Sequence, residues 1–125
     1  QSAALKFKEY ISTEGYKILV GRNNRENDYL TTVIAGKNDL WFHTKNIPGS
    51  HVIVFSGGAE VSEDTVVKAA KLAAENSKGA GSSNVPVDYT QIKYVKKPSG
   101  AKPGMVIYKT NKTVYVTPDK KEVRE

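Results

Sequence analysis

The chain has 125 residues, a formal net charge of +6 at pH 7 and no cysteine. This length suits one hydrophobic core, so we predict a single domain over residues 1–125, with its core in about residues 10–118. The missing cysteines exclude disulfides and thiolate zinc sites, and no apolar run reaches the ~18 residues of a membrane span. Because the chain opens at Gln1 without a signal peptide, we expect a cytoplasmic domain excised from a longer protein.

The first third of the chain reads as a β-hairpin followed by a helix. Residues 7–12 and 16–20 are short runs of strand-forming residues on either side of Gly15, which is typical of two strands joined by a turn. The GRNN motif (residues 21–24) interrupts the second run, and an Asn there can cap a helix over about residues 25–35. An apolar stripe along this helix predicts that one of its faces is buried.

The DLWFH motif that follows has the two-residue period of a strand. Leu40 and Phe42 therefore point to one face, which we expect to be buried. Asp39, Trp41 and His43 point to the other face, which we expect to be accessible to solvent. The motif thus predicts a candidate binding face that carries an acid, an indole and an imidazole.

The second half of the chain predicts one more helix and several strands. The apolar run at residues 51–55 is typical of a buried strand, and Ser62 can cap a helix over about residues 63–77. Three further runs of β-forming residues follow at 85–97, 105–109 and 112–117. We expect the last two runs to pair with each other across a tight turn. This order of elements predicts an α+β domain with a mixed or largely antiparallel sheet and two main helices.

The positive charge is concentrated near the C-terminus. Residues 1–90 contain ten Lys or Arg and ten Asp or Glu, so residues 91–125 hold the whole excess of six. The lysine-rich segment (residues 92–109) contains five lysines and no acidic residue, and its Pro and Gly content predicts an exposed connection. Lysines can contact phosphates while Tyr94 and Tyr108 stack on bases, which favours nucleic-acid binding. A merely solubilising edge is the alternative.

A catalytic or metal site is a third possibility for this sequence. His43, His51 and Asp39 could be combined into a small metal-dependent hydrolase or nuclease. However, the spacing of the histidines matches no compact metal motif, and Ser50 lacks the elbow sequence of a serine nucleophile. We therefore predict no catalytic residue, no metal and no cofactor.

Five separated segments resemble, in order, the NFACT-R domain, which is the RNA-binding module of the NFACT proteins. They are ILVGRNNRENDYLT, DLWFHTKNIPGSHVIV, KAAKLAAENS, VPVDYTQIKYVKKPSGAKPGMVIY and KTVYVTP. The family includes bacterial RqcH proteins, also named fibronectin-binding protein A-like, which act in ribosome-associated quality control. The resemblance implies a tRNA- and rRNA-binding module of a factor that recruits tRNA to stalled large ribosomal subunits for template-independent tailing of the nascent chain.

The resemblance and the side-chain chemistry together nominate a set of RNA-binding residues. They are Arg22, Asn23, Asn24, Asp39, Trp41, His43, Lys45, Ser50, His51, Tyr94, Lys96, Lys97 and Lys102. We assign the cations to phosphate contact and Trp41, Tyr94 or Tyr108 to stacking, with packing as the alternative role of Trp41. The expected partners are tRNA, large-subunit rRNA and the rest of the longer protein, without a membrane. The family's older name keeps an extracellular fibronectin-binding adhesion module as a second functional class.

Overall fold

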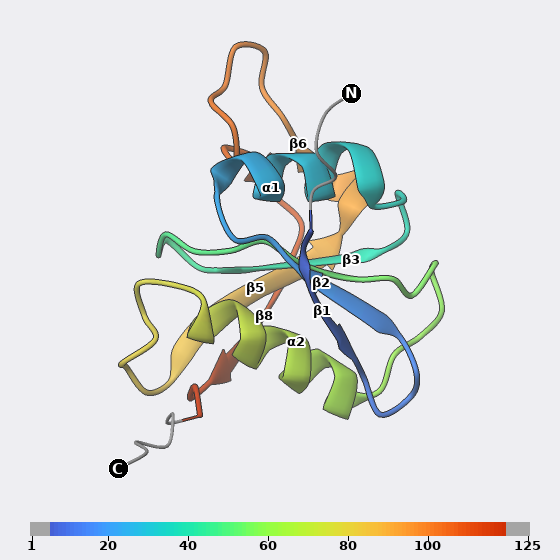
Figure 1. Ribbon diagram of the computed structural model, residues 1–125, viewed down its shortest axis with the longest axis vertical. Helices are drawn as coiled ribbons and strands as arrows, with labels where there is room; N and C mark the ends of the chain where they lie inside the picture. The colour runs from blue at the N-terminus through green and yellow to red at the C-terminus, as the bar shows by residue number, and fades with distance from the viewer. Residues whose placement is uncertain (1–5, 120–125) are drawn as a thin grey trace.

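The computed structural model describes residues 6–119, which form three layers (Figure 1). A six-stranded sheet is the middle layer, with its strands in the order β1-β2-β4-β3-β5-β8 and every neighbouring pair antiparallel. The strands are β1 (Lys8–Ile11), β2 (Lys17–Val20), β3 (Leu40–Thr44), β4 (Val52–Val54), β5 (Val85–Gln91) and β8 (Lys112–Val116). The predicted α+β class, with a largely antiparallel sheet and two main helices, is confirmed.

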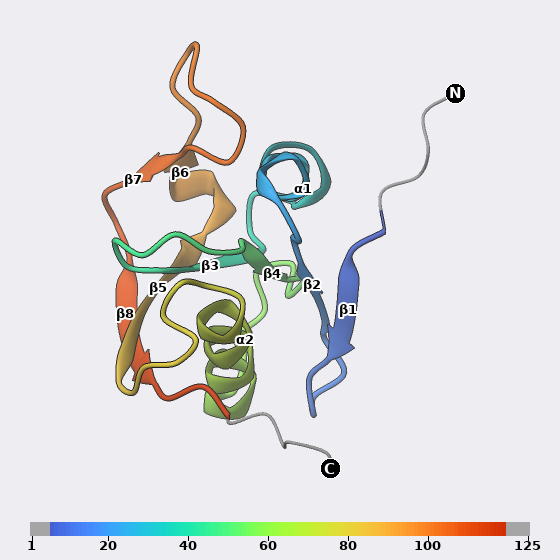
Figure 2. The same ribbon diagram turned by 60° about the vertical axis from the view of Figure 1, so that its left-hand side comes forward.

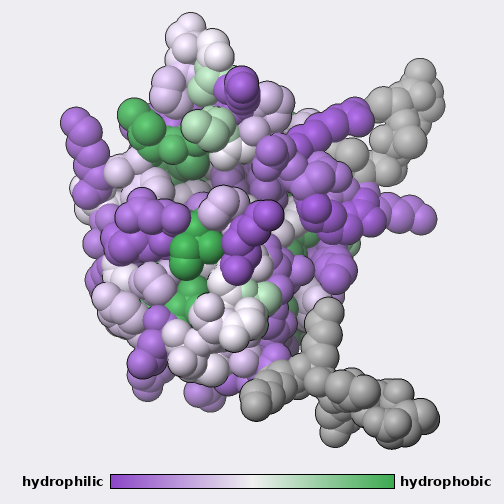
Figure 3. Space-filling view, turned by 90° about the vertical axis from the view of Figure 1, so that its left-hand side faces the viewer, coloured by the Kyte–Doolittle hydropathy of each residue, from purple (hydrophilic) through white to green (hydrophobic). Residues whose placement is uncertain are grey.

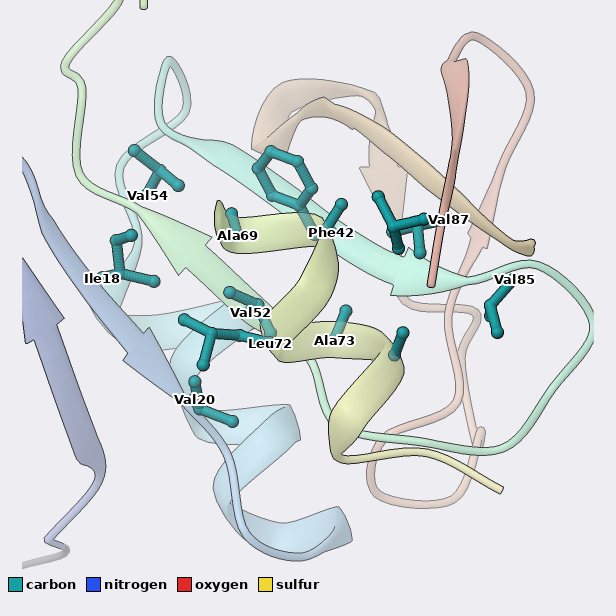
Figure 4. Packing of buried hydrophobic residues seen from close by; sticks show 13 residues of the cluster. Ile18, Val20, Phe42, Val52, Val54, Ala69, Leu72, Ala73, Val85 and Val87 are labelled. Carbon is teal, nitrogen blue, oxygen red and sulfur yellow. The ribbon is translucent and has the colours of Figure 1, made fainter. Parts of the chain in front are cut away.

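Helix α2 (Glu63–Glu75) covers one face of the sheet. The Ser62 hydroxyl accepts a hydrogen bond from the Thr65 N–H, so the helix begins at the predicted cap. Buried alanines let the helix approach the strands closely, and Figure 4 shows it packed against Phe42 and Val52. This interface forms the larger of two hydrophobic clusters.

The opposite face of the sheet is covered by a second layer of short elements. These are α1 (Asn24–Tyr29), the π-helical turn η1 (Leu30–Ile34), the 3₁₀ turn η2 (Ile92–Tyr94) and the paired strands β6 (Val95–Lys96) and β7 (Ile107–Tyr108). Together α1 and η1 correspond to the predicted helix over residues 25–35. Within the described range, no helix has both the length and the hydropathy that crossing a membrane requires.

The DLWFH motif alternates as predicted, but both of its faces are covered. Phe42 packs under α2, whereas Trp41 lies on the opposite face and has 0% of its surface exposed. Asp39 is also buried, and His43 is half-buried. The predicted solvent-accessible face is therefore wrong, because side chains of η1, η2 and the β6-β7 hairpin pack over it.

The last strands pair differently from the prediction. Strand β7 pairs with β6 and β8 pairs with β5, so residues 105–109 and 112–117 do not form the expected hairpin. The loop between β6 and β7 projects beyond α1 at the top of Figure 1, and Figure 2 shows it standing clear of the sheet. The exposed connection predicted within the lysine-rich segment is present there.

Candidate nucleic-acid interface

Three segments that are distant in sequence line a shallow, open hollow of about 330 Å³, called the polar hollow here because most of its lining residues are polar. They are the GRNN motif with the start of α1, the turn before β4 and the C-terminal end of α2, all on the left-hand side of Figure 1. The polar hollow is lined by Arg22, Asn23, Asn24, Asn27, Pro48, Gly49, Ser50, Asn76, Ser77 and Lys78. None of these lining residues is Asp or Glu. Figure 3 views this side, where hydrophilic surface predominates over a few small apolar patches.

Two glycines permit the close approach of these segments. A Cβ at Gly49 would lie 2.6 Å from the Ser77 Cβ, at the point where the turn and the helix end form a backbone bridge. A Cβ at Gly21 would lie 2.1 Å from Asn27 Oδ1. A side chain at Gly49 would meet the backbone of Ser77, whereas a side chain at Gly21 would displace the Asn27 amide from its hydrogen bond with His51.

Asn23 caps α1 and helps to place Arg22 at the edge of the polar hollow. The Asn23 Oδ1 accepts a hydrogen bond from the Glu26 N–H at 2.9 Å, which confirms the predicted cap. The buried Glu26 carboxylate forms a 2.5 Å ion pair with Arg22 and accepts a second bond from the Arg22 backbone N–H. The side-chain hydrogen bond with Arg22 lowers the pKa of Glu26, against the opposing effect of burial. Arg22 remains half exposed, so its guanidinium can still meet an anion.

Asn27 connects the polar hollow to a buried histidine. Its Oδ1 accepts from the His51 backbone N–H at 3.0 Å, and His51 Nδ1 accepts from the Trp41 Nε1–H at 3.1 Å. The Thr31 hydroxyl lies 2.7 Å from the same Nδ1. Burial, and after it the neighbouring His43, lower the pKa of His51 to about 3, so its ring is neutral at pH 7. Trp41 and His51 are thus core residues, and the proposed stacking and contact roles do not fit their burial.

Asp39 is buried, and its carboxylate links two loops by hydrogen bonds. Its Oδ2 accepts from the Gly36 N–H and its Oδ1 accepts from the Gly57 N–H, each at 2.8 Å. It therefore does not complete a catalytic constellation with His43 and His51. Across residues 6–119, no three His, Cys, Asp or Glu side chains gather in a group that could hold a metal ion.

Lys45 contacts a buried carboxylate, which changes its predicted role. Asp88 on β5 accepts from the Tyr108 hydroxyl at 2.5 Å and from the Thr113 hydroxyl at 2.7 Å. The Lys45 Nζ lies 3.0 Å from the same carboxylate. Burial raises the pKa of Asp88, but the hydrogen bonds from Tyr108, Thr113 and Lys45 outweigh it and leave the pKa lowered. The Tyr108 hydroxyl is therefore occupied by the Asp88 carboxylate, and Tyr94 is the predicted stacking residue that remains exposed.

The Asp28 carboxylate on α1 holds the lysine-rich segment in place through two contacts. The Asp28 Oδ1 lies 2.7 Å from the Lys97 Nζ and accepts from the Gly104 N–H at 3.0 Å. The Lys97 Nζ also donates to the Lys102 carbonyl. Burial raises the pKa of Asp28, but the Lys97 and Gly104 contacts outweigh it and lower the pKa. Lys97 thus stabilises the loop through its contacts with Asp28 and the Lys102 carbonyl. Lys96 and Lys102 are exposed and have no ion-pair partner in the described part of the chain.

The polar hollow and the lysine-rich segment meet at Asn24. Asn24 lines the hollow, and its Oδ1 lies 3.2 Å from the position that a Cβ on Gly104 would occupy. The structure therefore brings Arg22, Asn24 and Ser50 together with the loop, while it separates the buried members of the DLWFH motif from them. Lys78 adds a cation that the sequence analysis missed, and its position directly after the KAAKLAAENS segment was the available signal.

Relatives of known sequence match almost the whole chain. The Rqc2 homolog RqcH of Bacillus subtilis (strain 168) is 58% identical over 110 residues, which cover 88% of this chain and 19% of that protein. The Rqc2 homolog RqcH of Streptococcus pneumoniae serotype 2 is 46% identical over 119 residues, or 94% of this chain and 21% of that protein. Coiled-coil domain-containing protein 25 of Bos taurus is 28% identical over 120 residues, or 92% of this chain and 57% of that protein. The chain thus spans about a fifth of the length of these RqcH relatives.

A solved structure has a similar fold, and a protein family matches the sequence of this chain. The C-terminal part of the fibronectin/fibrinogen-binding protein from Streptococcus suis matches with a TM-score of 0.89 and 44% identity, over 95% of this chain and 48% of that chain. Residues 6–121 match the family described as NFACT protein RNA binding domain, as the five sequence segments predicted. The chain therefore belongs to the NFACT protein RNA binding domain family.

Proposed function

We propose that this chain is the RNA-binding module of a ribosome-associated quality control factor, and that it contacts tRNA or large-subunit rRNA without catalysing a reaction. The observation that supports the proposal is one polar surface that runs from Lys78 through the polar hollow to Lys102. Cations on such a surface bind phosphates irrespective of base sequence. In the whole factor, which would work in the cytoplasm, this contact would help to recruit tRNA to a stalled large subunit for nascent-chain tailing.

The two exposed lysines of the loop region provide the test of this proposal. Replacing Lys96 and Lys102 together by Ala should weaken binding to unrelated RNA sequences, because two phosphate contacts are lost. The slope of log affinity against log salt should shrink by about 1.4 for single strands to about 1.8 for duplexes. The measurement is a titration of the chain with tRNA and with rRNA fragments at several salt concentrations.

A matched control removes the same charge elsewhere. Lys8 on β1 and Lys112 on β8 are exposed at the two edges of the sheet. Their joint replacement by Ala should leave the salt slope close to that of the wild type. Equal slopes for the two double variants would mean that the lysine-rich segment does not form the RNA surface.

Fibronectin binding is the second candidate, because the Streptococcus suis neighbour is named a fibronectin/fibrinogen-binding protein. Titrating the chain with fibronectin and with tRNA at equal ionic strength separates the two functions. We expect binding to tRNA and none to fibronectin at the same concentrations. A fibronectin affinity above the tRNA affinity at every salt concentration would reject the RNA-binding proposal.

A further inference from the structure

Ser50 presents an unused hydroxyl at the polar hollow. It lines the hollow and only 8% of its surface is exposed, yet its hydroxyl forms no hydrogen bond within residues 6–119. Its backbone N–H donates to the Asn76 carbonyl at 3.0 Å, which holds the residue against the end of α2. The buried side-chain atom without a partner in the described residues is Ser56 Oγ, so the Ser50 hydroxyl still reaches solvent and is open to a ligand in the hollow. Ser50 therefore offers one positioned donor to a group inside the hollow.

The surroundings of Ser50 favour a negatively charged group. Arg22 and Lys78 line the polar hollow, and none of its lining residues is acidic. The side-chain oxygens of Asn23 and Asn27 already accept from backbone N–H groups. The Asn76 carbonyl at the end of α2 is likewise engaged by the Ser50 N–H. With these acceptors occupied, Lys78 and the half-exposed Arg22, whose guanidinium also pairs with Glu26, supply the positive charge at the hollow.

We propose that the polar hollow is a subsite for one phosphodiester group of an unpaired RNA nucleotide, with the Ser50 hydroxyl donating to a non-bridging phosphate oxygen and Arg22 and Lys78 flanking it. This inference rests on the proposed RNA-binding function and adds a defined contact to it. A volume of about 330 Å³ is at the lower end of the range for ligand pockets, so the hollow takes one nucleotide rather than a duplex. The Asn24 side chain, which lines the hollow, also lies close to Gly104, so the loop that carries Lys102 borders the hollow.

A pair of serine variants tests the subsite. Ser56 is also 8% exposed and its hydroxyl also has no partner, but it does not line the polar hollow. Ser50→Ala should weaken binding of a short single-stranded RNA oligonucleotide about tenfold, because a hydrogen bond to a charged group is lost. Ser56→Ala should leave the affinity unchanged, and both variants should keep the melting temperature within a few degrees of the wild type.

A neutral oligonucleotide identifies the atom that Ser50 contacts. The wild type should bind the same oligonucleotide with methylphosphonate linkages more weakly, and Ser50→Ala should cost clearly less than tenfold with this probe, because its remaining phosphoryl oxygen is an uncharged and weaker acceptor. A full tenfold loss with the neutral probe would show that the Ser50 contact does not depend on phosphate charge and would overturn the subsite.

Two other outcomes separate this inference from the proposed function. Equal affinities of Ser50→Ala and Ser56→Ala for the charged oligonucleotide would overturn the subsite, while a loss of affinity in the Lys96→Ala/Lys102→Ala variant would leave RNA binding in place. Failure of the wild-type chain to bind both tRNA and the oligonucleotide would reject the RNA-binding function itself.

Discussion

Trp41 has the chemistry of a base-stacking residue, yet the indole is enclosed by the protein. Its Nε1–H donates to His51, and its ring lies edge to face with Tyr108 at 4.9 Å between centroids. The Tyr108 contact joins the sheet to the layer that carries α1 and the β6-β7 hairpin, whereas His51 lies directly before β4. At the scale of the residue, burial therefore assigns Trp41 to packing, and Tyr94 is the predicted stacking residue that is still exposed and can meet a base.

Replacing Trp41 by Ala tests this assignment. The cavity left behind should lower the free energy of unfolding by about 3–5 kcal/mol, as measured by urea denaturation. Tyr115→Ala on β8 is the control, because 63% of Tyr115 is exposed and its loss should change stability by less than about 0.5 kcal/mol. Wild-type stability together with lost RNA affinity in Trp41→Ala would restore the stacking role.

At the scale of the element, the lysine-rich segment is held by its contacts with α1. Its Pro and Gly residues leave few backbone hydrogen bonds of its own, so a partner from another element decides its position. Asp28 supplies that partner by accepting from Gly104 and pairing with Lys97. The loop that carries Lys102 is thereby held against α1, next to the Asn24 side chain that lines the polar hollow.

Asp28→Ala should release this loop. Amide exchange at Gly104 should accelerate about tenfold or more, since a hydrogen bond to a charged acceptor is lost. The freed Lys97 should also steepen the salt dependence of RNA binding by up to about 0.7–0.9 in slope. Asp119→Ala is the control, because Asp119 is exposed and pairs with Lys71 on α2. Unchanged exchange at Gly104 in Asp28→Ala would show that the loop is held by other contacts.

At the scale of the whole molecule, the packing of the three layers buries His51 and half-buries His43. Burial is the largest cause that lowers the pKa of both His43 and His51. In the unfolded chain their pKa values return to about 6.5. Below that pH the unfolded state binds protons that the folded state does not bind, so acid favours unfolding.

The free energy of unfolding should therefore fall between pH 7 and pH 5. With a folded pKa of about 3, His51 alone should contribute a loss of about 2 kcal/mol over this window. Acidic side chains add little here, because their unfolded pKa values lie near 4. Urea denaturation at several pH values provides the measurement. His51→Gln should lower stability at pH 7 but flatten this decline, whereas a steep decline that survives in His51→Gln would assign the effect to other groups.

Local patterns in the sequence were sufficient for most of the elements. The Asn23 and Ser62 caps are local signals, because each side-chain oxygen bonds an N–H three residues ahead. The alternation of residues 39–43 follows from strand geometry and was also predicted correctly. The five segments matching the family likewise indicated RNA binding without knowledge of the fold.

Only the tertiary structure decided which of these residues face solvent and which lie together. Strand period separates Trp41 from Phe42 but carries no information about a third layer, so the burial of Trp41 required the packing of distant elements over it. The pairing of β8 with β5 was likewise decided by strand neighbours far away along the chain. The polar hollow unites Arg22, Ser50 and Lys78 because close backbone approaches at glycines bring the three segments together. Such long-range contacts depend on the whole fold. A local sequence pattern contains only one of the two segments that form each contact, so it cannot predict the contact.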